Sequence, residues 1–288
     1  MNKLIGHDKT YNSLVSLFEK KLLPNKILLS GKRGIGKSIL INKFLNFLYS
    51  KDKNSNNLIN NNSHPNIFKI FKKIDKKNIE ISQIREMIKF QNNSSFDNKI
   101  RTIIIDDVNY LNSSSSNSLL KVIEEPNNNV LFFLINNSEN FLSDTLKSRC
   151  VEFKLFLNRI EVKSIVNDYF KNQIYDKISV DFVNFYNSPS FLISFIEFLN
   201  ENSIDYENLI IEDLLIEIIK NKYYLNNEFI YQNLNVFIEL FFYKNINRSK
   251  NITYKIKDYF YFKLYQILKY NLDLETFFIE FEEKLLSE

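Results

Sequence analysis

The sequence is poor in the residues that make sharp turns and covalent cross-links. Its 288 residues include four glycines, four prolines, two histidines, one cysteine and no tryptophan. The single cysteine, Cys150, excludes an internal disulfide and any zinc site built from cysteines alone. No apolar run approaches the roughly 18 residues of a membrane span, and the first residues lack the apolar core of a signal peptide. We therefore expect a cytoplasmic protein without membrane contact.

Charge and length set only broad limits. The net charge of +4 is too small to indicate nucleic-acid binding by itself. A hydrophobic content of 44% supports a substantial core, and the length allows two or three modules.

Three of the four glycines belong to one short segment. Its eight residues are Gly31, Lys32, Arg33, Gly34, Ile35, Gly36, Lys37 and Ser38. They match G-x-x-x-x-G-K-[ST], the pattern of a phosphate-binding P-loop. Glycine lets the backbone bend so that its N–H groups point inward at phosphate oxygens. All eight residues are predicted to bind nucleotide.

The flanks of this segment fit the same interpretation. Residues 26–30 indicate a short buried strand, and residues 38–45 indicate a helix whose N-terminus faces the phosphates. Lys37 is expected to reach the β- and γ-phosphates, and the Ser38 hydroxyl to ligate Mg²⁺. ATP and Mg²⁺ are therefore the predicted cofactors.

A pair of acidic residues follows the strand predicted at residues 100–105. Asp106 and Asp107 end this predicted strand, where parallel strands present side chains to a ligand crevice. Asp106 is predicted to hold Mg²⁺, directly or through water, and Asp107 to polarise the attacking water. The alternative is a solvated pair of acids at a strand end.

Strand and helix patterns alternate over the first half of the chain, which predicts an α/β domain with a parallel sheet over residues 1–156. The tract at residues 51–63, rich in Asn, Ser and Lys, has no periodicity and is predicted to be a loop. The five predicted strands cover residues 26–30, 66–71, 100–105, 130–135 and 150–153.

The remainder of the chain has only helical periodicity, beginning with residues 159–171, 178–186 and 189–199. Phe, Tyr, Leu and Ile dominate the apolar faces of these predicted helices. We expect these aromatic side chains to pack in a core and not to stack on nucleic-acid bases.

Three segments resemble bacterial clamp-loader ATPases of the AAA+ class. Residues 106–112 resemble the family's acidic Walker B segment. Residues 117–126, which read N-S-L-L-K-V-I-E-E-P, resemble its N-A-L-L-K-x-L-E-E-P helix, and residues 148–150 match its S-R-C motif. Residues 63–66 and 81–85 resemble H-P-D and V-x-x-I-R segments of the delta-prime subunit of DNA polymerase III. The resemblance covers about residues 4–155.

The resemblance implies an architecture and a set of partners. An AAA+ P-loop domain with a five-stranded parallel sheet is expected at residues 1–156, a small helical lid at 157–206 and an all-α collar for oligomerisation at 207–288. The implied partners are the delta and tau/gamma subunits in a hetero-pentameric ring, the sliding clamp, and primer–template DNA through the complex.

The resemblance also implies two further site residues. Arg149 resembles an arginine finger that acts in trans on a neighbour's ATP, for which a planar, always-charged guanidinium is suited. The alternative for Arg149 is a local salt bridge. Asn136 or Asn137 resembles the polar sensor near the γ-phosphate, and Asn136 is the predicted contact.

Departures from the family pattern weaken the expected hydrolysis. Position 107 is Asp where many ATPases have Glu, and Phe191 stands where a lid arginine would touch the nucleotide. The tract at 51–63 replaces the cysteine-rich zinc module of some members, so no zinc site is expected. We predict a delta-prime-like subunit that binds ATP with weak or absent hydrolysis. The alternatives are a tau/gamma-like ATPase motor and a P-loop ATPase outside replication.

Overall fold

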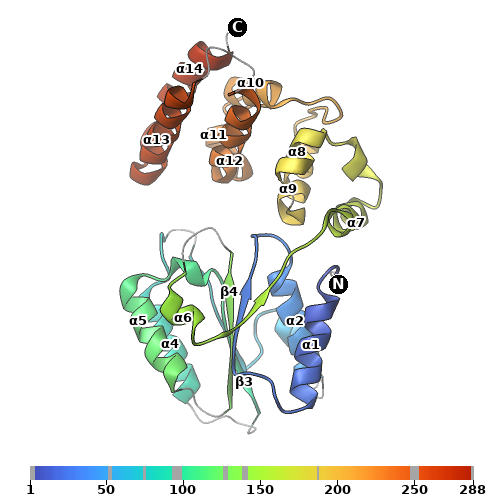
Figure 1. The fold of residues 1–288 in the computed structure, drawn as a ribbon, viewed down its shortest axis with the longest axis vertical. Helices are drawn as coiled ribbons and strands as arrows, with labels where there is room; N and C mark the ends of the chain where they lie inside the picture. Colours follow the sequence, from blue (N-terminus) through green and yellow to red (C-terminus); the bar gives the residue numbers. More distant parts are fainter. Residues whose placement is uncertain are drawn as a thin grey trace. The chain divides into compact units, whose positions relative to one another are not determined.

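The structure is a computed structural model. The chain consists of two compact units (Figure 1). The first unit comprises residues 1–165 with 188–190, and the second comprises residues 166–187 with 191–288. The described residues are 4–50, 54–73, 76–92, 99–125, 129–137, 142–186, 188–246 and 253–286.

A parallel sheet forms the centre of the first unit. Its strands are β1 (Lys26–Ser30), β2 (Ile67–Ile70), β3 (Arg101–Ile105), β4 (Val130–Asn136) and β5 (Val151–Lys154). They lie in the order β2-β3-β4-β1-β5, and every neighbouring pair is parallel. All residues of β3 and β4 are buried, including Arg101 and Thr102, as expected for strands covered on both faces. The predicted five-stranded parallel sheet is confirmed.

Helices cover both faces of this sheet (Figure 1). On one face lie α1 (Asp8–Glu19) and α2 (Lys37–Leu48), and on the other lie α4 (Ile81–Asn92) and α5 (Ser113–Glu124). Two short helical segments, η1 (Val108–Tyr110) and α6 (Asp144–Lys147), follow β3 and β4.

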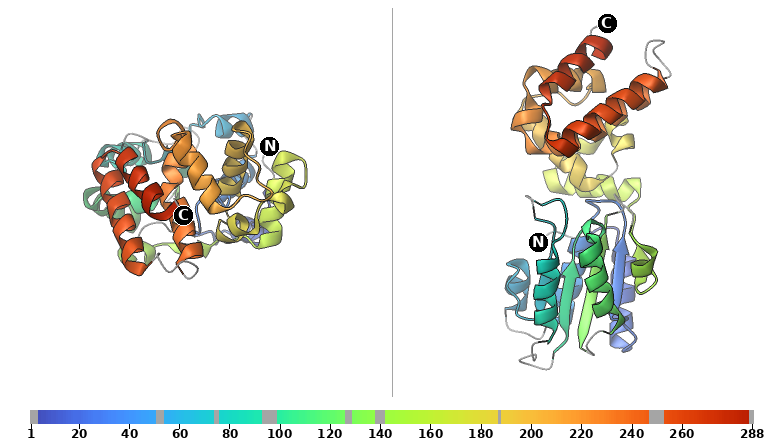
Figure 2. Two further views of the ribbon diagram at one scale, coloured as in Figure 1. Left: turned by 90° about the horizontal axis from the view of Figure 1, so that it is seen from above. Right: turned by 90° about the vertical axis from the view of Figure 1, so that its left-hand side faces the viewer.

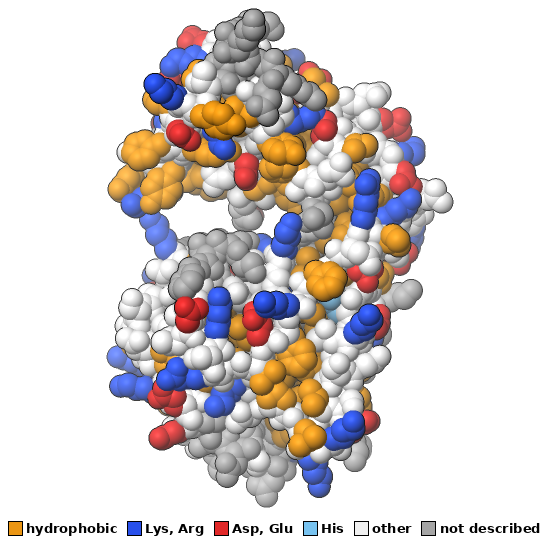
Figure 3. All heavy atoms as spheres, in the orientation of Figure 1, with side chains coloured by type: hydrophobic (Ala, Val, Ile, Leu, Met, Phe, Trp, Pro, Cys, Tyr) orange, Lys and Arg blue, Asp and Glu red, His pale blue; other side chains and the backbone are white. Residues whose placement is uncertain are grey.

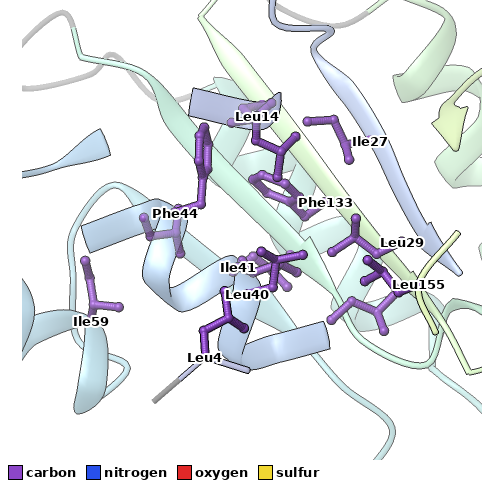
Figure 4. Packing of buried hydrophobic residues seen from close by; sticks show 14 of the residues in the cluster. Leu4, Leu14, Ile27, Leu29, Leu40, Ile41, Phe44, Ile59, Phe133 and Leu155 are labelled. Atoms are coloured by element: carbon purple, nitrogen blue, oxygen red, sulfur yellow. The ribbon is translucent and has the colours of Figure 1, made fainter. Parts of the chain in front are cut away.

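Side chains of β4 alternate between the two cores that these layers enclose. Phe133 lies on the α1–α2 side, where it packs edge-on against Phe44 with ring centroids 5.8 Å apart and where Leu14 and Ile27 are also buried (Figure 4). Phe132 lies on the α4–α5 side with Met87. Because side chains alternate along a strand, the register of β4 determines which of the residues that follow it faces the P-loop.

The loop prediction for residues 51–63 was wrong in part. Residues 51–53 lie outside the described residues, but Ser55–Asn60 form helix α3. Ser55 and Ile59, one turn apart, are both buried, and Ile59 joins the core beneath α2. A single apolar side chain, buried by tertiary packing, outweighs the weak helix propensity of the surrounding asparagines.

The second unit contains only helices among its described residues (Figure 2). Helix α7 begins in the first unit and continues into the second. No helix in the described parts of the chain combines the length and apolarity needed to cross a bilayer. The helices are α7 (Arg159–Phe170), η2 (Ile174–Lys177), α8 (Val180–Phe185), α9 (Pro189–Glu201), α10 (Ile211–Lys220), α11 (Tyr223–Asn226), α12 (Glu228–Asn245), α13 (Tyr254–Tyr270), α14 (Glu275–Phe281) and a π-helical turn, η3 (Glu282–Leu286).

Aromatic side chains build the core of the second unit, as predicted. Phe182, Phe195 and Phe237 are fully buried. Phe191 packs among them, with its ring centroid 4.3 Å from that of Tyr186 and 6.1 Å from that of Phe237. Phe191 is therefore part of a hydrophobic cluster.

Candidate functional site

The P-loop connects β1 to α2 and relies on glycine at two backbone angles. Gly34 has φ of +78° and Gly36 has φ of +95°, both in the left-handed region that side chains with a Cβ rarely adopt. Gly36 is the residue just before α2, so the bend directs the first helical N–H groups toward the loop. This geometry is that of an anion-binding loop at a helix N-terminus.

Close neighbours add a second requirement for glycine. A Cβ on Gly31 would lie 2.4 Å from the carbonyl oxygen of Leu155, and one on Gly34 would lie 2.4 Å from Ser188 Oγ. Ser188 Oγ donates to the Arg33 carbonyl at 2.7 Å, and Ser190 N–H donates to the Gly34 carbonyl at 3.3 Å. Two serines more than 150 positions away in sequence thus hold the loop.

Lys37 lies across the loop. Its side chain is largely buried, and Nζ donates to the carbonyls of Gly31 at 2.7 Å and Lys32 at 2.5 Å. These bonds keep a positive charge at the centre of the loop while they fix the backbone around it. An ammonium held this way can interact with phosphate oxygens as a point charge.

Ser38 and Asp106 come together at the start of α2, as the sequence predicts for two Mg²⁺ ligands. Ser38 Oγ lies 3.3 Å from Asp106 Oδ2. Burial raises the pKa of the Asp106 carboxyl, and the charge of Asp107 raises it further. Hydrogen bonds donated by Asp107 N–H and Ser38 and the charge of Lys37 oppose that shift. A bound divalent cation would favour the ionised form.

Asp107 is held from two sides. It has φ of 57°, which is uncommon outside glycine, although aspartate tolerates it better than most residues. Its Oδ1 accepts a hydrogen bond from Arg33 Nη2 at 2.8 Å and another from Asn137 Nδ2. The acid predicted to polarise water is therefore engaged by the P-loop and by the segment after β4.

The two candidate sensor residues occupy different positions. Asn136 is the last residue of β4, is paired with Ser30, and its carbonyl accepts from Gly31 N–H at 3.2 Å. Asn137 lies one residue later, on the same side as Ile135, and its side chain contacts Asp107. Because side chains alternate along a strand, Asn137 and not the predicted Asn136 lines the pocket.

These residues line a pocket of about 380 Å³ in the first unit. Cationic, hydroxyl, amide and carboxylate groups all contribute to its wall, and the loop carries the glycines. The lining residues are Arg33, Gly34, Gly36, Lys37, Ser38, Ile39, Asp106, Asp107, Ile135, Asn137 and Ser190.

His7 and Lys69 lie outside this lining, and each interacts with a residue of the site. His7 is buried, with Nε2 2.7 Å from the carbonyl oxygen of Ile35, so the segment before α1 holds the P-loop. Lys69 on β2 lies within a basic run of the sequence, for which a solvated face is expected and contact with DNA phosphate is the alternative. Its Nζ donates to Asn62 Oδ1 at 2.6 Å; burial lowers the pKa of Lys69, and the charge of Asp106 opposes that effect.

Arg149 is not among the residues that line the pocket. Its Nη2 lies 2.6 Å from Glu124 Oε1, its Nε donates to the same oxygen at 2.9 Å, and its Nη1 donates to the Thr145 carbonyl at 2.8 Å. About a third of the side chain is exposed. Within one chain, Arg149 therefore forms the local salt bridge that the sequence offered as the alternative to a trans finger.

Comparison with solved structures finds chains of similar fold. A DNA polymerase III gamma subunit-related protein from Thermotoga maritima is similar over 95% of this chain and 99% of its own, with a TM-score of 0.55 and 15% identity. The RuvB Holliday junction branch migration motor of the same organism is similar over 76% of this chain and 77% of its own, with a TM-score of 0.44 and 17% identity. The Bacillus subtilis DNA clamp loader delta protein is similar over 80% of this chain and 74% of its own, with a TM-score of 0.36 and 14% identity.

Sequence comparison identifies a family. No curated protein matches the chain significantly. A family model described as "DNA polymerase III, delta subunit" matches residues 6–158, just over half of the chain. The match spans the sheet, the P-loop and Arg149. The chain has an α/β fold with a helical C-terminal region, and it belongs to the family described as DNA polymerase III, delta subunit.

Proposed function

We propose that this chain is the delta-prime subunit of the DNA polymerase III clamp loader. It acts in the cytoplasm with delta and tau/gamma subunits in a hetero-pentameric ring that loads the sliding clamp onto primed DNA. The observation that carries the proposal is the combination, in a member of this family, of a P-loop pocket with a partly exposed arginine, Arg149, outside that pocket.

The pocket has the groups that ATP with Mg²⁺ requires. The glycine bends of the loop leave its N–H groups for phosphate, and a Cβ at Gly34 would meet Ser188. Lys37 would contact phosphate oxygens, while Ser38 and Asp106 would hold the metal. Bound Mg²⁺ would neutralise charge on the phosphates. Gly31, Lys32, Arg33, Ile35, Gly36 and Asn137 complete the proposed nucleotide site, with Asn136 behind it in β4.

Hydrolysis by this chain itself is proposed to be weak. Phe191 packs with Tyr186 and Phe237, so position 191 supplies no cation. Asp107 has one methylene fewer than glutamate, and its carboxylate is already bonded to Arg33 and Asn137. Positioning and charge stabilisation supply most of the rate of phosphoryl transfer, so each of these features lowers it.

Arg149 is proposed to act on the ATP of a neighbouring subunit. Its guanidinium is partly exposed, and the ion pair with Glu124 is of the surface kind that contributes about 0–1 kcal/mol. A neighbour's phosphates, carrying several charges, can compete for that guanidinium.

We further propose a lid at residues 157–206 and a collar at residues 207–288. Helix α13 exposes Tyr259, Phe262 and Tyr265, with Phe262 61% exposed, and hydrophobic side chains gather on the surface over α13 in Figure 3. Exposed aromatic clusters of this kind favour protein–protein contact. They support an oligomerisation role for the collar.

Co-purification tests the proposal against its alternative, a tau/gamma-like motor. The chain is mixed with delta and tau/gamma subunits, the complex is sized, and clamp loading on primed DNA is measured with and without this chain. We expect one copy in each complex and loading that depends on it. A chain that assembles with itself and hydrolyses ATP rapidly without partners would favour the motor.

A further inference from the structure

The carboxylate of Asp107 is restrained by groups from two separate parts of the first unit. Arg33 Nη2 and Asn137 Nδ2 both donate to the same oxygen, Oδ1. The Asp107 side chain is only 14% exposed, whereas that of Arg33 is 53% exposed. The acid is thus fixed inside the pocket wall, and the cation reaches it from the solvent side.

This contact conflicts with the work expected of a water-polarising acid. Such an acid must point a free lone pair at the water and must be basic enough to attract its proton. The guanidinium of Arg33 donates a hydrogen bond to Oδ1, so a lone pair of that oxygen is directed at Arg33 and not at a water molecule. Two donors on Oδ1 also limit how far the short side chain can turn.

We propose that Arg33 is a positioning residue that, together with Asn137, restrains Asp107 and thereby limits ATP hydrolysis by this chain. The inference rests on the proposed nucleotide-binding function and assigns to a variable position of the P-loop a role that the G-x-x-x-x-G-K-[ST] pattern does not give it. The Arg33 side chain acts through Asp107, while the Arg33 backbone remains part of the proposed nucleotide site.

The competing account for Arg33 is a direct phosphate contact, and it predicts the opposite result. If the guanidinium binds phosphate, Arg33→Ala weakens ATP affinity and lowers the rate. If it restrains Asp107, Arg33→Ala raises the turnover number about two- to fivefold, as expected for loss of a half-exposed ion pair, with little change in KM. The turnover number of Arg33→Lys should lie between those of the unmodified chain and Arg33→Ala, because a flexible point charge holds a carboxylate less firmly than a planar fork of donors.

The experiment uses the full chain with Mg-ATP, measuring affinity by titration calorimetry and hydrolysis by phosphate release. Arg33→Ala is compared with Arg85→Ala, an exposed arginine on α4 away from the pocket, and with Arg33→Ala combined with Asp107→Asn. We expect a gain in Arg33→Ala alone, none in Arg85→Ala, and loss of the gain in the double variant.

Three outcomes overturn the inference in different ways. Normal Mg-ATP binding with an unchanged or reduced rate in Arg33→Ala rejects the restraint and leaves the proposed function standing. No Mg-ATP binding by the unmodified chain, with a normal melting temperature, rejects both. A gain that persists in the double variant also rejects the inference, since Asp107 would then not transmit it.

Discussion

Arg149 and Glu124 form an ion pair, with 2.6 Å between Nη2 and Oε1, that joins the segment after α6 to the end of helix α5. The pair brings together two motifs that lie 25 residues apart, E-E-P and S-R-C. The arginine proposed for a neighbour's ATP is thus kept in a defined place by its own chain.

Replacing Arg149 with alanine distinguishes its proposed role as a trans arginine finger from its structural role in the ion pair with Glu124. The ion pair is partly exposed, so its loss should lower the melting temperature of the chain by no more than about 2–4 °C. The assembled loader should lose ATPase activity, by roughly 10³-fold where one finger acts alone and by less where several share the work. Scanning calorimetry of the subunit and phosphate release by the complex measure both effects.

Two further variants sharpen this test. Arg149→Lys should restore little activity, because an ammonium lacks the fork of donors. Glu124→Gln breaks the ion pair but keeps the arginine, so the complex should remain active. A destabilised Arg149→Ala subunit in a complex of normal activity would remove Arg149 from the proposed site.

Lys37→Ala should remove most nucleotide binding. The side chain supplies the central positive charge of the loop and also braces the carbonyls of Gly31 and Lys32. Calorimetric titration with Mg-ATP should show at least a tenfold loss of affinity, which corresponds to about 1.4 kcal/mol. Lys43→Ala, on the same helix but outside the pocket, should bind normally; equal affinities for both variants would argue against a working P-loop.

The raised pKa of Asp106 predicts a pH dependence of stability in metal-free buffer. Because folding raises this pKa above 3.8, the native state binds the proton more tightly, and stability falls as pH increases through the window between the two pKa values. Asp106→Asn should therefore raise the melting temperature at pH 7, by about 2–4 °C for each kcal/mol gained. The gain should vanish below pH 3.8, where both states are protonated; a gain of the same size at both pH values would contradict this cause.

Alanine at the two left-handed glycines should have unequal effects. Gly36→Ala incurs backbone strain of about 1–2 kcal/mol, but its Cβ meets nothing closer than 3.9 Å. Gly34→Ala incurs the same strain and also places Cβ 2.4 Å from Ser188 Oγ and 2.6 Å from Ser190 Cβ. Thermal melts should rank Gly34→Ala below Gly36→Ala, and the reverse order would mean that the two serines do not hold the loop.

The sheet and the P-loop could be predicted because their signals are local. Three consecutive isoleucines, Ile103, Ile104 and Ile105, identify β3, and a glycine pattern identifies the loop between β1 and α2. The pairing of Arg33 with Asp107 joins residues 74 positions apart, and that of Ser188 with Arg33 joins residues 155 apart. A single sequence carries no pattern for such contacts, because each depends on how complete elements pack.

The choice between Asn136 and Asn137 as the proposed sensor shows the same limit for a single position. Asn136 and Asn137 are identical in chemistry and adjacent in sequence, so only the register of β4 against β1 separates them. A shift of one residue moves a side chain to the opposite face of a strand. The strand could be predicted from its composition, but the register required the pairing partner.

Ser188 and Ser190 make the first unit discontinuous along the sequence. A polypeptide that stopped at residue 165 would contain every strand of the sheet, yet it would lack the donors that reach the carbonyls of Arg33 and Gly34. No single cut therefore yields this unit whole. An excised N-terminal fragment would carry an under-supported loop, and a failure of that fragment to bind nucleotide would say nothing about the intact chain.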